Sequence, residues 1–242
     1  MSAVMAAYLD TIAGRIKGLT DHAGAAMEAA RDVIVQAVRG DNLVYLFGTG
    51  HSHMLTEEVH YRAGGPAFTV PILATTFMLH EGAIASTEAE RTEGLVAPVF
   101  ARYPISADDV LFVISNSGIN AAPVEAARLG KSLGCTVIAI TSIAYSTAAA
   151  KGRERIADIA DITIDNGIPA GDALVDLPGS DLKAGPASTA VGAAILNAIF
   201  ADVAYHLAED ATPPVYRSAN MPGAQDINAR LVAHYAGRNR HL

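Results

Sequence analysis

Two continuously apolar segments in this chain each run into a short loop of Gly, Ser, Thr, His or Asn that precedes a predicted helix. Residues 43–47 are followed by the loop Gly48–Ser52, and residues 110–114 by the loop Ser115–Gly118. Uninterrupted apolar segments of this length are typical of strands buried on both faces of a parallel sheet. A helix N-terminus carries unpaired N–H groups and a partial positive charge, and therefore attracts anions. Two such loops predict a phosphorylated ligand.

Strand-like and helix-like segments alternate along most of the chain. Further strands are predicted near residues 67–70, 135–140 and 162–164, and helices over residues 2–39 (one long or two abutting), 52–63, 76–103, 121–133, 188–208 and 224–235. Such alternation favours an α/β fold in which helices cover both faces of a parallel sheet. Residues 165–185 are rich in Gly, Pro and Asp and are predicted to form a loop.

Composition excludes several classes of partner. The 242 residues carry a formal net charge of −8 and include no basic run, so nucleic acid is not an expected partner. A single cysteine, Cys135, leaves no intramolecular disulfide and suits a reducing compartment. We find no secretory signal pattern and no apolar segment of membrane-spanning length, and therefore expect a cytoplasmic protein with no membrane partner.

Three segments carry a resemblance to a known family. Residues 48–52 (GTGHS), 114–120 (ISNSGIN) and 134–141 (GCTVIAIT) resemble the SIS (sugar isomerase) phosphosugar-binding domain, and the similarity extends over residues 40–210. The whole chain is similar to bacterial single-domain SIS proteins, and residues 179–185 resemble the N-acetylmuramic acid 6-phosphate etherase branch. The resemblance implies a Rossmann-like three-layer sandwich with a five-stranded parallel sheet. It also implies a homodimer with sites at the carboxyl ends of the strands, near the partner subunit.

We expect the chain to form one domain, because no internal repeat or linker divides it. An N-terminal helical segment, residues 1–40, is expected to pack on the SIS domain of residues 41–210. Residues 211–242 are expected to form a C-terminal tail that is part of the same domain.

The resemblance places the phosphate of a sugar phosphate on the two Gly/Ser loops. Matched residue by residue, Ser52 of the first loop and Ser115, Ser117 and Asn120 of the second would hold it. Hydroxyl donors suit a phosphate, and glycine lets backbone N–H groups approach it closely. The full predicted binding set is Gly50, His51, Ser52, Ser115, Asn116, Ser117, Asn120, Ser188 and Thr189, of which the last two begin the long helix 188–208.

The sequence departs from the family pattern at positions that matter for catalysis. Many catalytic members carry a glutamate late in the first helix, where this chain has Arg62, and the long-helix histidine of heptose-type isomerases is absent. Moving a proton between adjacent carbons requires a carboxylate or an imidazole. We predict Glu90 as this base, because residues 88–94 are similar to an acidic helix that supplies a catalytic glutamate in the etherase branch. A solvated helix face is the competing interpretation; Glu58 is the second candidate and His80 a further one.

Neither a metal ion nor an organic cofactor is expected. His51, His53, Glu57 and His60 are close in sequence, but their order is not HExxH and no further ligand cluster is evident. Hydrogen bonds to substrate or backbone are the commoner role of such histidines. The first loop also lacks the third glycine of the dinucleotide-binding fingerprint, where His53 stands instead.

These observations favour a phosphosugar-binding protein that interconverts an aldose and a ketose phosphate by proton transfer through an enediolate. Two alternatives stay open. The likeness of residues 179–185 to the etherase branch favours a sugar-phosphate lyase, and the departures from the catalytic pattern favour a non-catalytic phosphosugar sensor.

Overall fold

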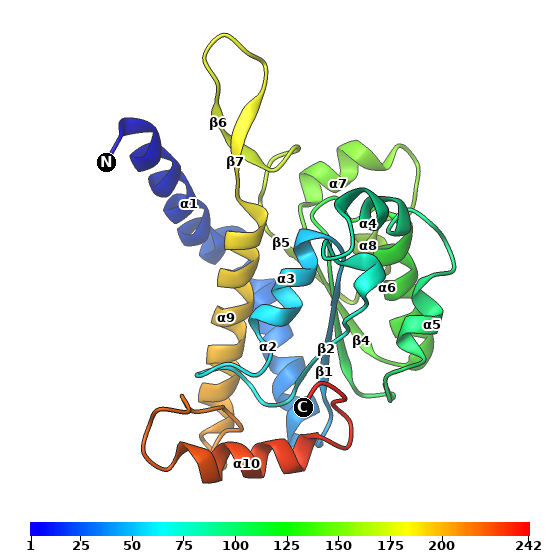
Figure 1. Ribbon diagram of the computed structural model, residues 1–242, viewed down its shortest axis with the longest axis vertical. Helices are drawn as coiled ribbons and strands as arrows, with labels where there is room; N and C mark the ends of the chain where they lie inside the picture. Colours follow the sequence, from blue (N-terminus) through cyan, green and yellow to red (C-terminus); the bar gives the residue numbers. More distant parts are fainter.

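A computed structural model describes residues 1–242 and contains a five-stranded, all-parallel sheet (Figure 1). In chain order the strands are β1 (Val44–Gly48), β2 (Thr69–Pro71), β3 (Val110–Ile114), β4 (Thr136–Thr141) and β5 (Ile162–Asp165). They lie side by side in the order β2-β1-β3-β4-β5. β1 and β3 pair over their whole length, from Val44 opposite Val110 to Gly48 opposite Ile114. The predicted α/β fold with five parallel strands is confirmed.

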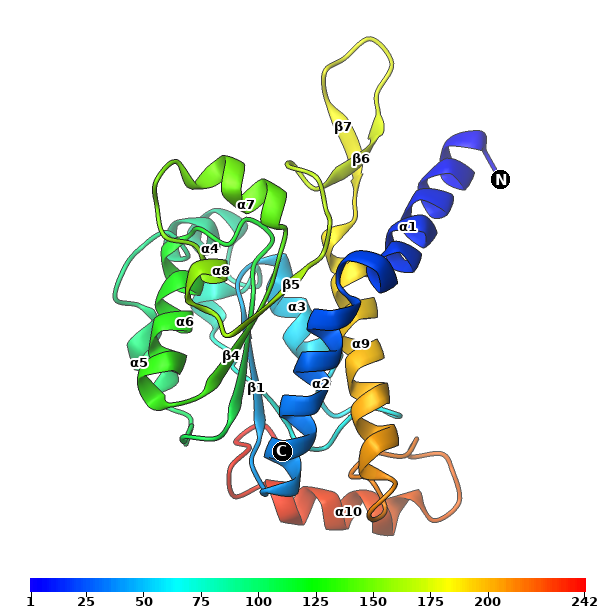
Figure 2. The ribbon, with the colours of Figure 1, turned by 180° about the vertical axis from the view of Figure 1, so that it is seen from behind.

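Helices cover both faces of the sheet and complete a three-layer sandwich (Figures 1 and 2). One layer holds α2 (Gly24–Arg39), α3 (His51–Glu58) and α9 (Ser188–Leu207), with α1 (Ala3–His22) leading into α2. The other holds α4 (Ala83–Ala89), α5 (Val96–Phe100), α6 (Ala121–Leu133), α7 (Ile143–Ala150) and α8 (Ile156–Ile159). A short 3-10 helix, η1 (Thr75–Phe77), follows β2. The last helix, α10 (Ala224–Tyr235), lies across the end of the sheet at which the strands begin.

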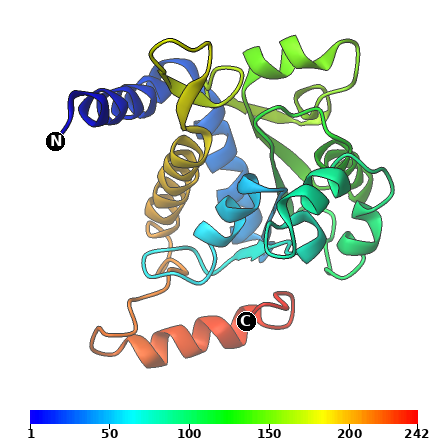
Figure 3. The ribbon, with the colours of Figure 1, turned by 45° about the horizontal axis from the view of Figure 1, so that its top comes forward.

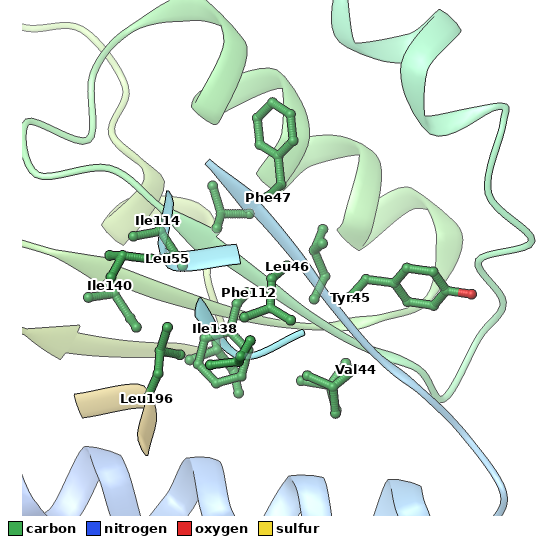
Figure 4. Packing of buried hydrophobic residues seen from close by; sticks show 14 of the residues in the cluster. Val44, Tyr45, Leu46, Phe47, Leu55, Phe112, Ile114, Ile138, Ile140 and Leu196 are labelled. Atoms are coloured by element: carbon green, nitrogen blue, oxygen red, sulfur yellow. The ribbon is translucent and has the colours of Figure 1, made fainter. Parts of the chain in front are cut away.

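Alternate side chains of the strands enter opposite halves of the core (Figure 4). Phe112 of β3 contacts Phe200 of α9, with ring centroids 6.1 Å apart. Phe47 of β1 contacts Phe100 of α5 in the opposite layer, with centroids 5.5 Å apart. Each such side chain contributes about 1.5–3 kcal/mol when it is fully buried. Burial on both faces explains why these strands are apolar throughout.

Two predicted helices are shorter in the structure than the sequence suggested. α3 ends at Glu58 rather than near residue 63, and Tyr61 after it takes a left-handed φ of 45°. The segment 76–103, predicted to be helical throughout, is divided into η1, α4 and α5. Gly82 and Gly94, with φ of 148° and 83°, stand at these divisions. Backbone of this kind interrupts a helix and is readily adopted by glycine.

The predicted loop 165–185 contains a hairpin instead. β6 (Ala173–Asp176) and β7 (Lys183–Pro186) pair in antiparallel fashion around a turn that includes Gly179, where φ is 71°. The hairpin and α1 both project from the body at the end of the sheet where the strands finish (Figures 1 and 3). The Tyr8 hydroxyl of α1 donates to the Pro186 carbonyl at 2.7 Å, which ties the two together.

α9 has the length and hydropathy of a membrane span, contrary to the expectation that no segment does. It contains 20 residues and has a mean hydropathy of 1.5. In the fold, however, α9 packs against α2 and α3, and eight of its residues are buried, among them Ile195, Leu196 and Phe200. A helix at the centre of a globular core has the same composition, and the contacts of α9 are those of a core helix.

The C-terminal residues bind the end of the sheet at which the strands begin. The Asp109 carboxylate is fully buried and accepts hydrogen bonds from the Leu43 and Ser106 backbone N–H groups at 2.8 and 2.7 Å. Arg238 donates to both oxygens of the same carboxylate, at 2.8 and 2.6 Å. Asn239 is also buried and donates to the Thr69 carbonyl of β2 at 3.1 Å. These polar contacts fasten the tail together with the rings of Tyr216 and Tyr235, which are buried in the core.

Acidification below pH 6.5 is expected to weaken the attachment of the tail. The Tyr103 hydroxyl lies 2.9 Å from Nε2 of His241, and burial together with neighbouring His60 and Arg240 lowers the His241 pKa from 6.5 to about 4. The unfolded chain therefore takes up this proton first. The contribution of neutral His241 to stability is complete above pH 6.5 and is lost as the pH falls towards 4.

Urea unfolding midpoints measured between pH 7.5 and 4.5 check this expectation. The decline in stability is expected to be shallower in a His241→Gln variant, because glutamine does not titrate. An identical decline in the two proteins would contradict it.

Candidate functional site

The two Gly/Ser loops meet where the direction of the chain reverses across the sheet. From β1 the chain passes through α3 to β2 on one side, and from β3 it passes through α6 to β4 on the other. α3 packs with α9 on one face, whereas α6 packs with α5 and α8 on the opposite face. Open α/β sheets bind ligands at such a switch point, beyond the carboxyl ends of the strands. The candidate site is therefore this edge, which Figure 3 tilts towards the viewer.

The first loop requires glycine for steric reasons. A Cβ atom on Gly48 would lie 2.5 Å from the Ser52 carbonyl oxygen, so the turn into α3 leaves no room for a side chain. Gly50 has φ 54° and ψ −128°, a conformation that essentially only glycine adopts. Its N–H donates to the Phe77 carbonyl at 2.8 Å and so connects the loop to η1.

The second loop is held by its own side chains. Ser115 is buried, and its Oγ accepts a hydrogen bond from the Gly118 N–H at 3.1 Å. Gly118 has φ 64°, and a Cβ there would lie 2.8 Å from Oγ1 of Thr141. The Asn116 carbonyl accepts from the Thr141 hydroxyl at 3.2 Å. The loop is therefore rigid, and Ser115 supports it from within.

Glu90 lies between the two loops. It directly follows α4, and its Oε2 accepts a hydrogen bond from Oγ1 of Thr49 in the first loop at 2.8 Å. Its Oε1 accepts from Nδ2 of Asn120 in the second loop, also at 2.8 Å, and the Glu90 carbonyl accepts from the Ala122 N–H at 2.9 Å. Arg91 Nη1 is 3.5 Å from Oε1. The carboxylate is thus placed at the switch point and can accept a proton there.

A narrow crevice opens between α3, α9 and the ends of β3 and β4. Its free volume is about 10 Å³, the space of one water molecule. It is lined by Ser52, Leu55, Ile114, Asn116, Ile140, Asn166, Ser188, Thr189 and Gly192. Polar groups from three loops and from the start of α9 therefore face one small space at the carboxyl edge.

Some of the predicted binding residues already make hydrogen bonds within the protein, and others do not. Ser188 donates its hydroxyl to Oδ2 of Asp172 at 2.6 Å, and its N–H to Oδ1 at 2.7 Å, so that Asp172 occupies the start of α9. Asn120 is engaged by Glu90. The hydroxyls of Ser52, Ser117 and Thr189 make no hydrogen bond within the chain. His51 is exposed at the start of α3.

A larger, open groove of about 610 Å³ lies beside Asn120 on the α6 side. Its charged residues are Arg91, Glu93, Glu125, Arg128, Arg153 and Glu154. Three positive and three negative side chains leave no net charge in the groove. It has the volume for a sugar ring, which the narrow crevice lacks.

The histidines of α3 do not assemble a metal centre. The structure gathers no group of three or more His, Cys, Asp or Glu side chains with suitable geometry. His53 is buried, its Nδ1 lies 3.8 Å from a Glu57 oxygen, and burial lowers its pKa. His60 Nε2 lies 3.4 Å from the His241 carbonyl, in the tail attachment.

Of the other two candidate bases, Glu58 lies apart from the loops, whereas His80 is close enough to His53 of α3 to contribute to the lowering of its pKa. Glu58 ends α3, about 9 Å along the helix axis from Ser52. It pairs with Arg62 and accepts a hydrogen bond from Asn197 Nδ2 at 3.1 Å. His80 is exposed in the turn before α4. Lys183, on β7, pairs with Asp176 across the hairpin at 2.8 Å.

Two residues of the site were not found by sequence reasoning: Thr49 and Asn166. Thr49 stands within the first loop, and Asn166 directly follows β5. Position after a predicted parallel strand was therefore a usable signal for Asn166. Asp172 was expected to lie in a loop that borders the site, but its contact with the start of α9, 16 residues later, had no local signal.

Comparison with known proteins identifies the family. A family model described as the SIS domain matches residues 7–142. UPF0309 proteins from Brucella canis and from Brucella melitensis biotype 2 are each 52% identical over 242 residues, which covers 100% of both chains.

Solved structures share the fold. A phosphoheptose isomerase from Neisseria gonorrhoeae matches with a TM-score of 0.56 and 16% identity, over 83% of this chain and 97% of that chain. A phosphoheptose isomerase from Francisella tularensis matches with a TM-score of 0.57 and 15% identity, over 85% and 100%. With matches over more than half of the sequence and along the full length of its relatives, this chain belongs to the SIS domain family.

Proposed function

We propose that this chain binds a phosphorylated sugar at the switch point between β1 and β3 and interconverts its aldose and ketose forms through an enediolate. The observation that carries the proposal is Glu90, which is hydrogen-bonded to both Gly/Ser loops. This arrangement puts a proton acceptor next to two anion-binding loops. The structural neighbours named as phosphoheptose isomerases, from two organisms, support this choice of reaction.

In this proposal the phosphate binds the free donors of the two loops. Ser52 and Ser117 contribute hydroxyls, and the first residues of α3 and α6, His51 and Ala121, contribute their backbone N–H groups. His51 and Asn116 complete the contacts, with Thr189 at the start of α9. Gly50 shapes the first loop, because its N–H already donates to the Phe77 carbonyl. Ser115, Ser188 and Asn120 act through the residues that they hold rather than on the ligand.

Glu90 then removes a proton from the carbon next to the carbonyl group and returns it to the adjacent carbon. The C–H bond breaks at one carbon and forms at the other, while the hydroxyl proton of the first carbon passes to the former carbonyl oxygen of the second. No oxidant or reductant is therefore required. Thr49 and Asn120 hold the carboxylate in one orientation during this transfer. His80 and Glu58 are the further candidates for proton transfer.

One observation favours a sensor as the second candidate function. Both oxygens of Glu90 already accept hydrogen bonds from neutral donors, an arrangement that also suits a purely structural carboxylate. A lyase of the etherase type remains the third candidate, through the likeness of residues 179–185, which form the turn and second strand of the β6–β7 hairpin.

A thermal-shift screen against sugar phosphates, followed by turnover of the hits in heavy water, tests the proposal. An isomerase leaves exchanged hydrogen on an intact sugar, a lyase releases a fragment, and a sensor is stabilised without turnover. We expect Glu90→Gln to lower kcat by about 100-fold or more while binding is retained. Glu88→Gln, exposed on α4 and outside the groove, is the matched control. Equal kcat in both variants would remove Glu90 from this role.

We further propose that the chain is a homodimer. Large apolar side chains are exposed at the N-terminus, along α1 and on the β6–β7 hairpin. They are Met1, Val4, Met5, Leu9, Leu177 and Leu182. Both α1 and the hairpin lie at the end of the molecule that carries the site, as the ribbon in Figure 3 shows. A two-stranded hairpin is only marginally stable alone in water. A second copy of the chain that packs against the hairpin would bury its exposed apolar side chains. Sedimentation equilibrium is expected to give twice the mass of one chain.

A further inference from the structure

The amide orientation of Asn116 is set by a chain of hydrogen bonds that begins at a backbone group. The Ile168 N–H, which can only donate, lies 3.1 Å from Oδ1 of Asn166. Nδ2 of Asn166 therefore takes the opposite side, where it donates to Oδ1 of Asn116 at 3.0 Å. Nδ2 of Asn116 is therefore the last group in this series of hydrogen bonds.

Asn116 Nδ2 is buried and has no acceptor within the protein. A buried donor without a partner costs about 1–3 kcal/mol, and such groups are rare in folded proteins. Asn116 and Asn166 both line the narrow crevice, together with the free hydroxyls of Ser52 and Thr189. A buried Asn116 donor without a partner, beside this crevice, indicates that its acceptor belongs to a ligand.

Asn166 itself is firmly placed. It is 4% exposed, and its N–H donates to the Thr141 carbonyl at 2.9 Å at the end of β4. Its side chain makes the two contacts described above and no others. Since both of these contacts are directional, Asn166 has one orientation, and through it Asn116 has one orientation as well.

We propose that Asn166 is a positioning residue of the ligand site, which turns the Asn116 amide so that its NH2 group donates to one acceptor oxygen of the ligand. This inference rests on the proposed phosphosugar site and specifies its chemistry. The crevice has room for a single oxygen atom or water molecule rather than a ring. The acceptor is therefore a terminal oxygen, either of the phosphate or of a sugar hydroxyl, and the ring lies outside.

Asn166→Asp reverses this orientation. The new carboxylate still accepts from the Ile168 N–H, but its second oxygen faces Asn116 and can only accept. The Asn116 amide then turns so that its NH2 group donates to this carboxylate, and it presents its own Oδ1 to the ligand. We expect affinity for the screened sugar phosphate to fall by about 10- to 100-fold. Asn166→Ala, which leaves both orientations open, is expected to lose less.

Inorganic phosphate, titrated against the same variants, distinguishes the two sources of the oxygen. A parallel loss of phosphate affinity assigns the acceptor to the phosphate, and an unchanged phosphate affinity assigns it to a sugar hydroxyl.

On an Asn116→Ala background, Asn166→Asp is expected to cause no further loss of affinity. If Asn166 had a merely structural role, the second substitution would lower the affinity further. Asn116→Asp, which also presents an acceptor to the ligand, replaces Asn166→Asp should the latter not fold.

A second measurement needs no ligand. The side-chain NH2 resonances of Asn116 are expected to shift in Asn166→Asp, because this group gains a carboxylate partner. Asn228→Asp is the control, because it alters a similar amide–backbone pair between α10 and Arg217, and it is expected to leave the Asn116 resonances in place. Unchanged resonances, or wild-type affinity in Asn166→Asp, would overturn the inference. Shifted resonances in a protein that binds no sugar phosphate would instead reject the proposed function.

Discussion

Asp109→Ala is expected to lower the free energy of unfolding by about 3–5 kcal/mol, because it leaves a guanidinium and two backbone donors without their acceptor. The carboxylate is fully buried and accepts from Leu43, Ser106 and Arg238. For a domain of this size the change corresponds to a decrease of roughly 6–20 °C in the melting temperature. Urea unfolding followed by circular dichroism measures it.

Asp32→Ala is the matched control for this prediction. Asp32 also pairs with an arginine, Arg31, but its side chain is 62% exposed, and exposed ion pairs contribute about 0–1 kcal/mol. The two substitutions therefore remove the same group from opposite environments. A loss of under about 1 kcal/mol in Asp109→Ala would mean that the tail does not depend on this carboxylate.

Gly48→Ala is expected to have the largest effect on the site. The added Cβ would lie 2.5 Å from the carbonyl oxygen and 2.7 Å from the carbonyl carbon of Ser52, and these are backbone atoms at the start of α3. The loop has to move, which displaces the free hydroxyl of Ser52 and the N–H groups of the first helical turn. A displacement of about 1 Å can cost about 100-fold in a positioned site, and we expect a loss of that order in sugar-phosphate affinity.

For Gly14→Ala, in contrast, we expect no loss of sugar-phosphate affinity. Gly14 lies within α1, and a Cβ added there would have no atom within 4 Å, so alanine is expected to stabilise the chain by about 0.5–1 kcal/mol without changing affinity. Isothermal titration with the best ligand of the screen measures both variants. Wild-type affinity in a folded Gly48→Ala variant would show that the first loop does not contact the ligand.

Much of the fold could be predicted because the signals are local. The apolar segments around Val44–Gly48 and Val110–Ile114 show their burial in five consecutive residues, and helix α10 was predicted with its observed bounds. The hairpin β6–β7 could not be predicted in this way. Its strands have four residues each and exposed or half-buried side chains, so no apolar pattern marks them.

The same distinction between local and non-local signals applies to the site. Both Gly/Ser loops were evident in the sequence, because each follows a buried strand and contains the glycines that its backbone requires. The partners of their side chains were not evident. Asn120 was predicted to be a phosphate ligand from its place in the loop, yet its amide donates to Glu90, 30 residues away in the chain.

By itself, the sequence determined the parallel sheet, the two loops at its carboxyl edge and the family, since each is encoded in short stretches of neighbouring residues. Only the tertiary structure decided which polar groups meet there: Glu90 with Thr49, and Asn166 with Asn116. The physical reason is that a hydrogen bond depends on distances of about 3 Å between atoms, and residues 41 or 50 positions apart reach that distance only once the sheet has brought their strands together.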